Sequence, residues 1–257
     1  MRSAGLNNQN LENMRELNYI DETIERDENP ALRIGSVGRS ALSTVYLMDC
    51  IEGMKQFPDK IFDLAVVDPP YGIERFKKCS EADVSRATTT KSRRIAERFQ
   101  RMETVNNDKP SDEYWSELFR VSKNQIVWGA NNFELPPSEY FLCWNKQQAL
   151  PNFATLEYAW VSMGLKKPAK LFTYSIHKHN QVDKVHPTQK PIPLYDWILQ
   201  NYAKEGDLIL DTHLGSQSSR IAAYKAGLDF VGFEIDREYF DNGNNRFKNF
   251  VSQGVLF

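Results

Sequence analysis

The residues best suited to chemistry form the tetrapeptide Asp68-Pro69-Pro70-Tyr71, which follows an apolar run at 61–67. An amine on an aromatic base is a weak nucleophile, because its lone pair is conjugated with the ring. The Asp68 carboxylate and the carbonyl oxygen of the rigid Pro69 can accept hydrogen bonds from such an amine. Tyr71 offers a face on which an unstacked base can lie. The motif therefore indicates chemistry on a base amine, although two prolines that merely end a strand would look the same.

A second candidate site is Asp211-Thr-His-Leu-Gly-Ser216, which lies between an apolar run and a predicted helix. A strand, a glycine turn and a helix N-terminus together favour the polar end of a cofactor, because backbone N–H groups there are free. Glu234 follows Gly215 by about 20 residues, the spacing at which an acidic residue binds ribose hydroxyls. The alternative for Glu234 is a surface carboxylate without a ligand.

The elements that must position these residues alternate between strand and helix along the chain. Strands are predicted at 44–48, 61–67, 125–128, 140–144, 158–162, 207–210 and 230–233, and helices at 50–57, 112–121, 192–202 and 218–226. This alternation is typical of an α/β sheet that is mainly parallel, in which ligands bind beyond the carboxyl ends of the strands. Asp49, Asp68, Asp211 and Glu234 all lie at or just after such ends.

Four motifs in order resemble the DNA amino-methyltransferases: those at 68–71, 186–191 (His-Pro-Thr-Gln-Lys-Pro), 211–216 and 232–236. Their order, with the catalytic motif before the cofactor turn, is similar to the β-class of permuted adenine N6 and cytosine N4 enzymes. The resemblance covers roughly residues 43–250. It implies an α/β fold with a Rossmann-like, seven-stranded, mainly parallel sheet and S-adenosyl-L-methionine as the cofactor.

The resemblance also implies roles for individual residues. Asp68, Pro69, Pro70 and Tyr71 match the catalytic motif, and Asp at its first position favours adenine over cytosine. The implied cofactor-binding residues are Asp49, Thr188, Gln189, Lys190, Asp211, His213, Gly215, Ser216 and Glu234. Two positions depart from the family pattern, because His213 replaces an aromatic residue and Gln217 replaces a glycine. Gln lacks the conformational freedom of glycine, so we expect Gln217 to weaken cofactor binding unless the turn adapts to it.

Composition narrows the class of protein. The chain has 257 residues, 41% of them apolar, and a formal net charge of −2, which is a globular profile. Residues 1–40 are polar and predict a mobile leader with a short helix at 11–19, followed by one methyltransferase domain at 41–257. No run is long enough to span a membrane, and three separated cysteines suggest neither disulfides nor zinc. We expect a cytoplasmic protein without a metal.

A basic stretch follows the catalytic tetrapeptide. Residues 75–101 contain nine Lys or Arg against three acidic residues, within a predicted insertion at 75–110. A solvated loop is the ordinary explanation, but phosphate contacts beside the active site fit equally well. The residues assigned to nucleic-acid binding are Arg75, Lys77, Lys78, Arg93 and Arg94. A thinner basic set at 163–185 is the candidate target-recognition segment, and its shortness predicts a short target.

The favoured function is transfer of a methyl group to adenine N6 in DNA. Within enzymes, the alternatives are RNA adenine, cytosine N4 or a protein glutamine as the acceptor. From another class, His213 and Gln217 are compatible with a non-catalytic DNA-binding relative that has lost the cofactor. The sequence leaves open whether the protein forms a homodimer.

Overall fold

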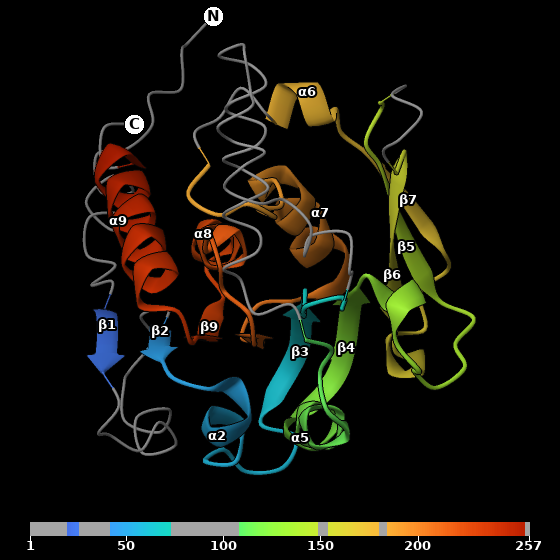
Figure 1. The fold of residues 1–257 in the computed structure, drawn as a ribbon, viewed down its shortest axis with the longest axis horizontal. Coiled ribbons are helices and arrows are strands. Elements are labelled where there is room, and N and C mark those ends of the chain that lie inside the picture. Colours follow the sequence, from blue (N-terminus) through green and yellow to red (C-terminus); the bar gives the residue numbers. More distant parts are fainter. Residues whose placement is uncertain (1–19, 26–41, 73–107, 149–153, 180–183, 255–257) are drawn as a thin grey trace, which may run out of the picture.

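The computed structural model describes residues 20–25, 42–72, 108–148, 154–179 and 184–254. Its centre is a nine-stranded sheet with the order β1-β2-β9-β8-β3-β4-β6-β5-β7, and strands form the middle layer of Figure 1. All neighbouring pairs are parallel except β4 with β6 and β5 with β6. The expectation of an α/β fold with a mainly parallel sheet is confirmed.

Each of the seven predicted strands is present among the inner strands of this sheet. They are β2 (Leu42–Leu47), β3 (Phe62–Val67), β4 (Ser122–Trp128), β5 (Phe141–Asn145), β6 (Leu156–Val161), β8 (Leu208–Asp211) and β9 (Asp229–Glu234). The expected number of strands was too low, because β1 (Ile20–Glu25) and β7 (Lys170–Thr173) extend the two edges. Strand β1 lies within the expected leader, and the helix expected at 11–19 lies outside the described residues.

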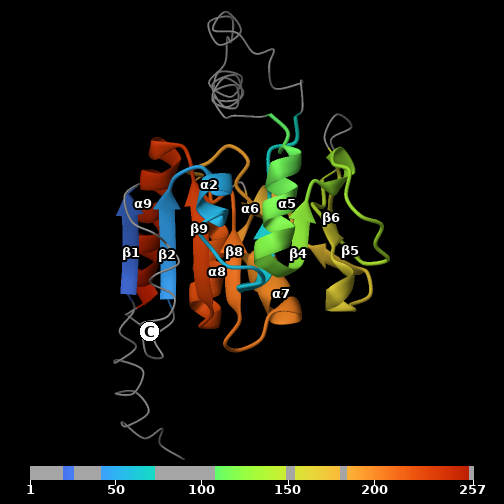
Figure 2. The ribbon, with the colours of Figure 1, turned by 90° about the horizontal axis from the view of Figure 1, so that it is seen from below.

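Helices cover both faces of the sheet. In Figure 1, α2 (Cys50–Met54) and α5 (Asp112–Val121) lie below the strands, and α7 (Ile192–Tyr202), α8 (Ser218–Ala226) and α9 (Arg237–Gly254) lie above them. Figure 2 shows α2 and α5 from the side on which they cover the strands. The predicted helices at 112–121, 192–202 and 218–226 are confirmed, and the one at 50–57 is shorter. The polar α9 and the short α6 (Ile176–His179) were not predicted.

Two apolar cores explain these layers, because alternate residues of a strand point to opposite faces. On β3, Val66 joins the core under α7 and α8, whereas Val67 joins the core under α2 and α5. On β4, Trp128 joins the core under α7 and α8, and Val127 joins the core under α2 and α5. In the part of the chain that the structure describes, no helix is both long and apolar enough to cross a bilayer.

The register brings distant residues to one edge of the sheet. Strands β2, β9, β8, β3 and β4 run parallel, so their carboxyl ends meet. Leu47 pairs with Glu234, and Asp211 pairs with Gly232. The acidic residues expected at strand ends therefore lie along the same edge, as the sequence predicts.

Candidate active site

The carboxylate of Asp68 lies directly after β3 and is held by two donors. The Tyr71 hydroxyl donates a short hydrogen bond to Asp68 Oδ1, and Lys190 Nζ donates one to Oδ2. Pro69 is buried and, having no N–H, ends the ladder of β3 without an unpaired donor. The side chain of Asp68 is 16% exposed, so the group is enclosed but within reach of a ligand.

Tyr71 is positioned by Gly129, which follows β4. A Cβ atom on Gly129 would lie 2.1 Å from Tyr71 Cε1, and the φ of Gly129 is +68°. Only glycine therefore leaves room for the ring. Phe133 packs against the ring in a T-shaped arrangement, with the two centroids 6.1 Å apart. Burial and the Asp68 carboxylate raise the pKa of Tyr71 well above its ordinary value, so the hydroxyl remains a donor.

Lys190 is the residue whose placement differs most from the role implied by the resemblance. Its side chain is 4% exposed and reaches the catalytic motif, with Nζ also 3.1 Å from the Tyr71 hydroxyl. On its other side, Nζ forms an ion pair of 3.2 Å with Glu157 Oε2. Lys146 pairs with the other oxygen of Glu157. The result is a row of alternating charges that ends at Asp68.

The predicted cofactor turn is held by two acidic side chains. Asp211 accepts hydrogen bonds from the His213 backbone N–H, at 3.0 Å, and from the Ser219 hydroxyl. Burial raises the pKa of Asp211 to about 7. Glu234 accepts from the Gly215 N–H at 2.8 Å, and Gly215 has a φ of +47°. Burial also raises the pKa of Glu234, so a polar or cationic ligand at this turn would relieve a desolvated carboxylate.

Two further acidic and aromatic positions border the turn. Asp49 caps α2 by accepting from the N–H groups of Ile51 and Glu52, at 2.8 and 3.1 Å. His213 Nδ1 lies 2.9 Å from the Thr212 hydroxyl, and its ring packs against Tyr114 with centroids 5.5 Å apart. Burial lowers the pKa of His213 to about 4, so it is a neutral ring at physiological pH. His213 can thus replace an aromatic residue without adding charge.

The turn adapts to Gln217. Its φ is +57°, but its side chain is fully buried between α8 and α9. The Nε2 group donates to Asn244 Oδ1 at 2.9 Å, and Oε1 accepts from Arg220 at 3.0 Å. Helix α9 makes room through Gly243, because a Cβ there would lie 2.7 Å from Gln217 Cγ. The sequence could not reveal this, since α9 was not predicted.

The segment at 186–191 packs onto the same turn. His186 approaches Gly215 closely, since a Cβ on Gly215 would lie 3.3 Å from His186 Cγ. Thr188 donates its backbone N–H to His186 Nδ1 at 3.3 Å. Gln189 Oε1 accepts from the Val185 N–H at 3.2 Å, and its buried Nε2 has no hydrogen-bond partner among the described residues.

The other residues and segments predicted for the site lie in several parts of the chain. Ser216 is buried with its hydroxyl 3.1 Å from that of Ser218, and its carbonyl accepts from Arg246. The predicted target-recognition segment includes β7 and α6. Gly129 lies in the segment 128–132, which follows an apolar strand and resembles the family's strand-end segments that border the base pocket. The basic residues Arg75, Lys77, Lys78, Arg93 and Arg94 lie outside the described residues.

The described residues fit the polar groups of S-adenosyl-L-methionine. Glu234 and Asp49 are acceptors for hydroxyl and amine hydrogens, and each carboxylate oxygen has more than one acceptor position. Asp211 supplies an anion beside a cofactor that carries cationic groups. Across the described residues, no group of three or more His, Cys, Asp or Glu could hold a metal ion.

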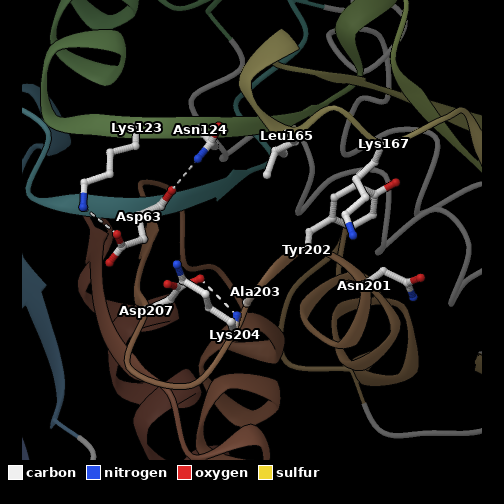
Figure 3. A pocket seen from close by; sticks show the side chains of 10 residues that line it. All are labelled: Asp63, Lys123, Asn124, Leu165, Lys167, Asn201, Tyr202, Ala203, Lys204 and Asp207. Atoms are coloured by element: carbon white, nitrogen blue, oxygen red, sulfur yellow. Dashed lines mark hydrogen bonds and ion pairs between the residues drawn. The ribbon is translucent and has the colours of Figure 1, made fainter.

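A pocket of about 420 Å³ lies away from this site (Figure 3). Asp63 and Lys123 line it from the starts of β3 and β4, and Asp207 precedes β8. It is therefore at the amino ends of strands whose carboxyl ends carry the acidic residues. The Lys123 ammonium is paired with Asp63 at 2.6 Å, so its charge is already neutralised.

Comparisons with known proteins point to one family. The N6/N4 methyltransferase family model, described as DNA methylase, matches residues 88–245. The type II methyltransferase M.HinfI of Haemophilus influenzae is 22% identical, over 80% of this chain and 68% of its own. M2.MboI of Moraxella bovis is 24% identical, over 79% and 86%. A structure of the cytosine-N4-specific PvuII DNA methyltransferase shares the fold, with a TM-score of 0.53, 13% identity and coverage of 82% and 91%.

Proposed function

Since the chain belongs to the N6/N4 family of DNA methyltransferases, which use S-adenosyl-L-methionine, we propose that it methylates the exocyclic N6 of adenine in DNA. The observation that carries this proposal is the arrangement after β3. There the Asp68 carboxylate, the carbonyl of Pro69 and the ring of Tyr71 stand together at the carboxyl edge of the sheet. Asp at the first position of the motif favours adenine over cytosine as the target.

The cofactor supplies an electrophilic methyl group, and the protein activates and orients the amine. Asp68 and the Pro69 carbonyl accept the two amine hydrogens, which draws the nitrogen lone pair out of conjugation with the ring. As the new N–C bond forms, the bond between the methyl group and the cofactor's sulfonium sulfur would break, leaving a neutral thioether. The nitrogen gives up one proton, which the Asp68 carboxylate can receive. Tyr71 stacks on the flipped base, a contact worth about 1–3 kcal/mol.

The cofactor is held at the next strands of the same edge. Glu234 would accept hydrogen bonds from the ribose hydroxyls, Asp49 would accept from the adenine amine, and Asp211 would balance positive charge near the methionine end. The Gly215 turn lets backbone approach the ligand closely. A cofactor bound at this turn would lie near the catalytic motif, because β8 and β3 are neighbours.

Methylome sequencing tests the proposal. DNA from methylation-free cells that express the chain should carry N6-methyladenine at one short motif. Cells expressing Asp68→Ala should carry none, while the purified variant should still bind S-adenosyl-L-methionine in calorimetry, because Asp68 acts on the target amine. Detection of N4-methylcytosine in place of N6-methyladenine would show that the target base is cytosine. Methylation of RNA alone would exclude DNA, and no methylation with no cofactor binding would indicate a non-catalytic relative.

A further inference from the structure

We propose that Lys190 is a positioning residue that ties the cofactor turn to the catalytic carboxylate and keeps Asp68 aimed at the target amine. The proposal rests on the proposed function, because it concerns the alignment of the methyl donor with the amine. In this role Lys190 contacts the Asp68 carboxylate and neither the methyl donor nor the target amine, so it acts through Asp68.

The main chain and the side chain of Lys190 bind two different parts of the site. The Lys190 carbonyl accepts a 2.8 Å hydrogen bond from Ser218 Oγ, at the start of the helix after the cofactor turn. Its Nζ binds Asp68 at the end of β3. One residue thus bridges the segment that carries the cofactor and the segment that carries the amine acceptor. A shift of about 1 Å between such groups can cost 10²-fold in rate.

The orientation of Asp68 depends on this contact. Tyr71 holds Oδ1 and Lys190 holds Oδ2, so the carboxylate plane is fixed by donors on both oxygens. Without Lys190, Tyr71 alone would restrain Asp68, and rotation about the Cβ–Cγ bond would no longer be prevented. Lys190 itself is confined by the rings of Tyr71 and Trp128, whose centroids are 5.7 and 5.6 Å from Nζ.

Lys190 keeps its charge in this enclosed place. Burial disfavours the ammonium, but the carboxylates of Asp68 and Glu157 outweigh that effect and raise its pKa. Burial likewise opposes ionisation of Glu157, and the ammonium groups of Lys190 and Lys146 outweigh it and lower its pKa. Glu157 thereby shares the ammonium with Asp68. Sharing matters because a lysine paired with Asp68 alone would withdraw more electron density from the acceptor that the amine needs.

Single-turnover methylation by purified variants tests the proposal. Lys190→Met should lower the rate constant by about 10²-fold, the order expected for misplacement of a catalytic group. The dissociation constant for S-adenosyl-L-methionine should stay close to that of the unchanged protein. Lys190→Arg should recover part of the rate, and methylammonium added to Lys190→Ala should restore part of it by occupying the vacated space. Lys146→Met is the matched control, since it removes an ammonium from Glu157 without touching Asp68, and its loss of rate should be smaller.

Full rate in Lys190→Met would overturn the proposal, and so would a loss in Lys146→Met as large as in Lys190→Met. If Lys190→Met does not fold, Lys190→Gln replaces it, and full rate in that variant has the same meaning. A thermal double-mutant cycle of Lys190→Met with Asp68→Asn needs no activity: the double variant should melt no lower than the worse single variant. If the losses of melting temperature in the two single variants add up in the double variant, the pairing of Lys190 with Asp68 is overturned. If the losses are coupled but the protein methylates nothing, only the proposed function is refuted.

Discussion

Position 217, where the family has glycine, gives the sharpest prediction, because the Gln217 side chain forms buried hydrogen bonds that glycine cannot make. Replacing Gln217 by Gly should destabilise the protein. The Gln217 amide joins α8 to α9, through Arg220 on one side and Asn244 on the other. Both partners are buried, at 0% and 6% exposure, so water cannot replace the lost contacts.

The magnitude follows from two opposing effects. The variant loses two buried hydrogen bonds, one of them from the charged Arg220, which together are worth about 2–4 kcal/mol. Arg220 and Asn244 are not left unpaired, because Arg220 also donates to Asn244 Oδ1 at 3.0 Å. Arg220 keeps its bonds to Ser43, which limits the loss. Glycine relieves the positive φ of position 217, which is worth about 1 kcal/mol. The expected net loss for Gln217→Gly is therefore about 1–3 kcal/mol.

Gln217→Ala separates the two effects, because it loses the same hydrogen bonds and keeps the backbone strain. Urea unfolding of the three proteins should rank the unchanged chain first, Gln217→Gly second and Gln217→Ala last, with about 1 kcal/mol between the two variants. Calorimetry on folded protein should show little change in S-adenosyl-L-methionine affinity. A Gln217→Gly variant that is more stable than the unchanged protein, or that binds the cofactor much more tightly, would refute this reasoning.

Three further predictions concern the site. Gly129→Ala should slow methylation and weaken base capture, because its Cβ would displace the Tyr71 ring; a DNA affinity and rate like those of the unchanged protein would contradict this. The double substitution of Arg93 and Arg94 by Ala should weaken DNA binding and flatten its salt dependence by roughly 0.9 in log–log slope per lost phosphate contact, measured by titration at several salt concentrations. An unchanged slope would show that Arg93 and Arg94 make no phosphate contacts, as the interpretation of this stretch as a solvated loop implies. Affinity for the cationic cofactor should fall as pH drops through about 7, because Asp211 becomes neutral there and the cofactor favours its ionised form. Calorimetry between pH 6 and 8 should show this trend, and Asp211→Asn should remove it.

The sequence by itself determined the fold class and most of the elements, for reasons that are local. Apolar runs such as 61–67 and 207–210 are long enough for a strand and too short for a helix, and proline or glycine ends them. The helix at 112–121 has a serine cap and an apolar stripe, and its bounds match the predicted ones to the residue. The order of the motifs and the apolar runs before them were likewise enough to place Asp68, Asp211 and Glu234 at strand ends.

Only the tertiary structure decided which of these residues touch. Lys190 and Asp68 are 122 positions apart, and their contact depends on how the 186–191 segment crosses the end of β3. The edge strands β1 and β7 are short or polar, so they carry little local signal and depend on their neighbours in the sheet for pairing. Gln217 is the clearest case: a substitution that looks unfavourable in the sequence is accommodated because α9, far along the chain, supplies Gly243 for space and Asn244 as a hydrogen-bond partner. Contacts of this kind arise from packing between distant segments, which no local pattern encodes.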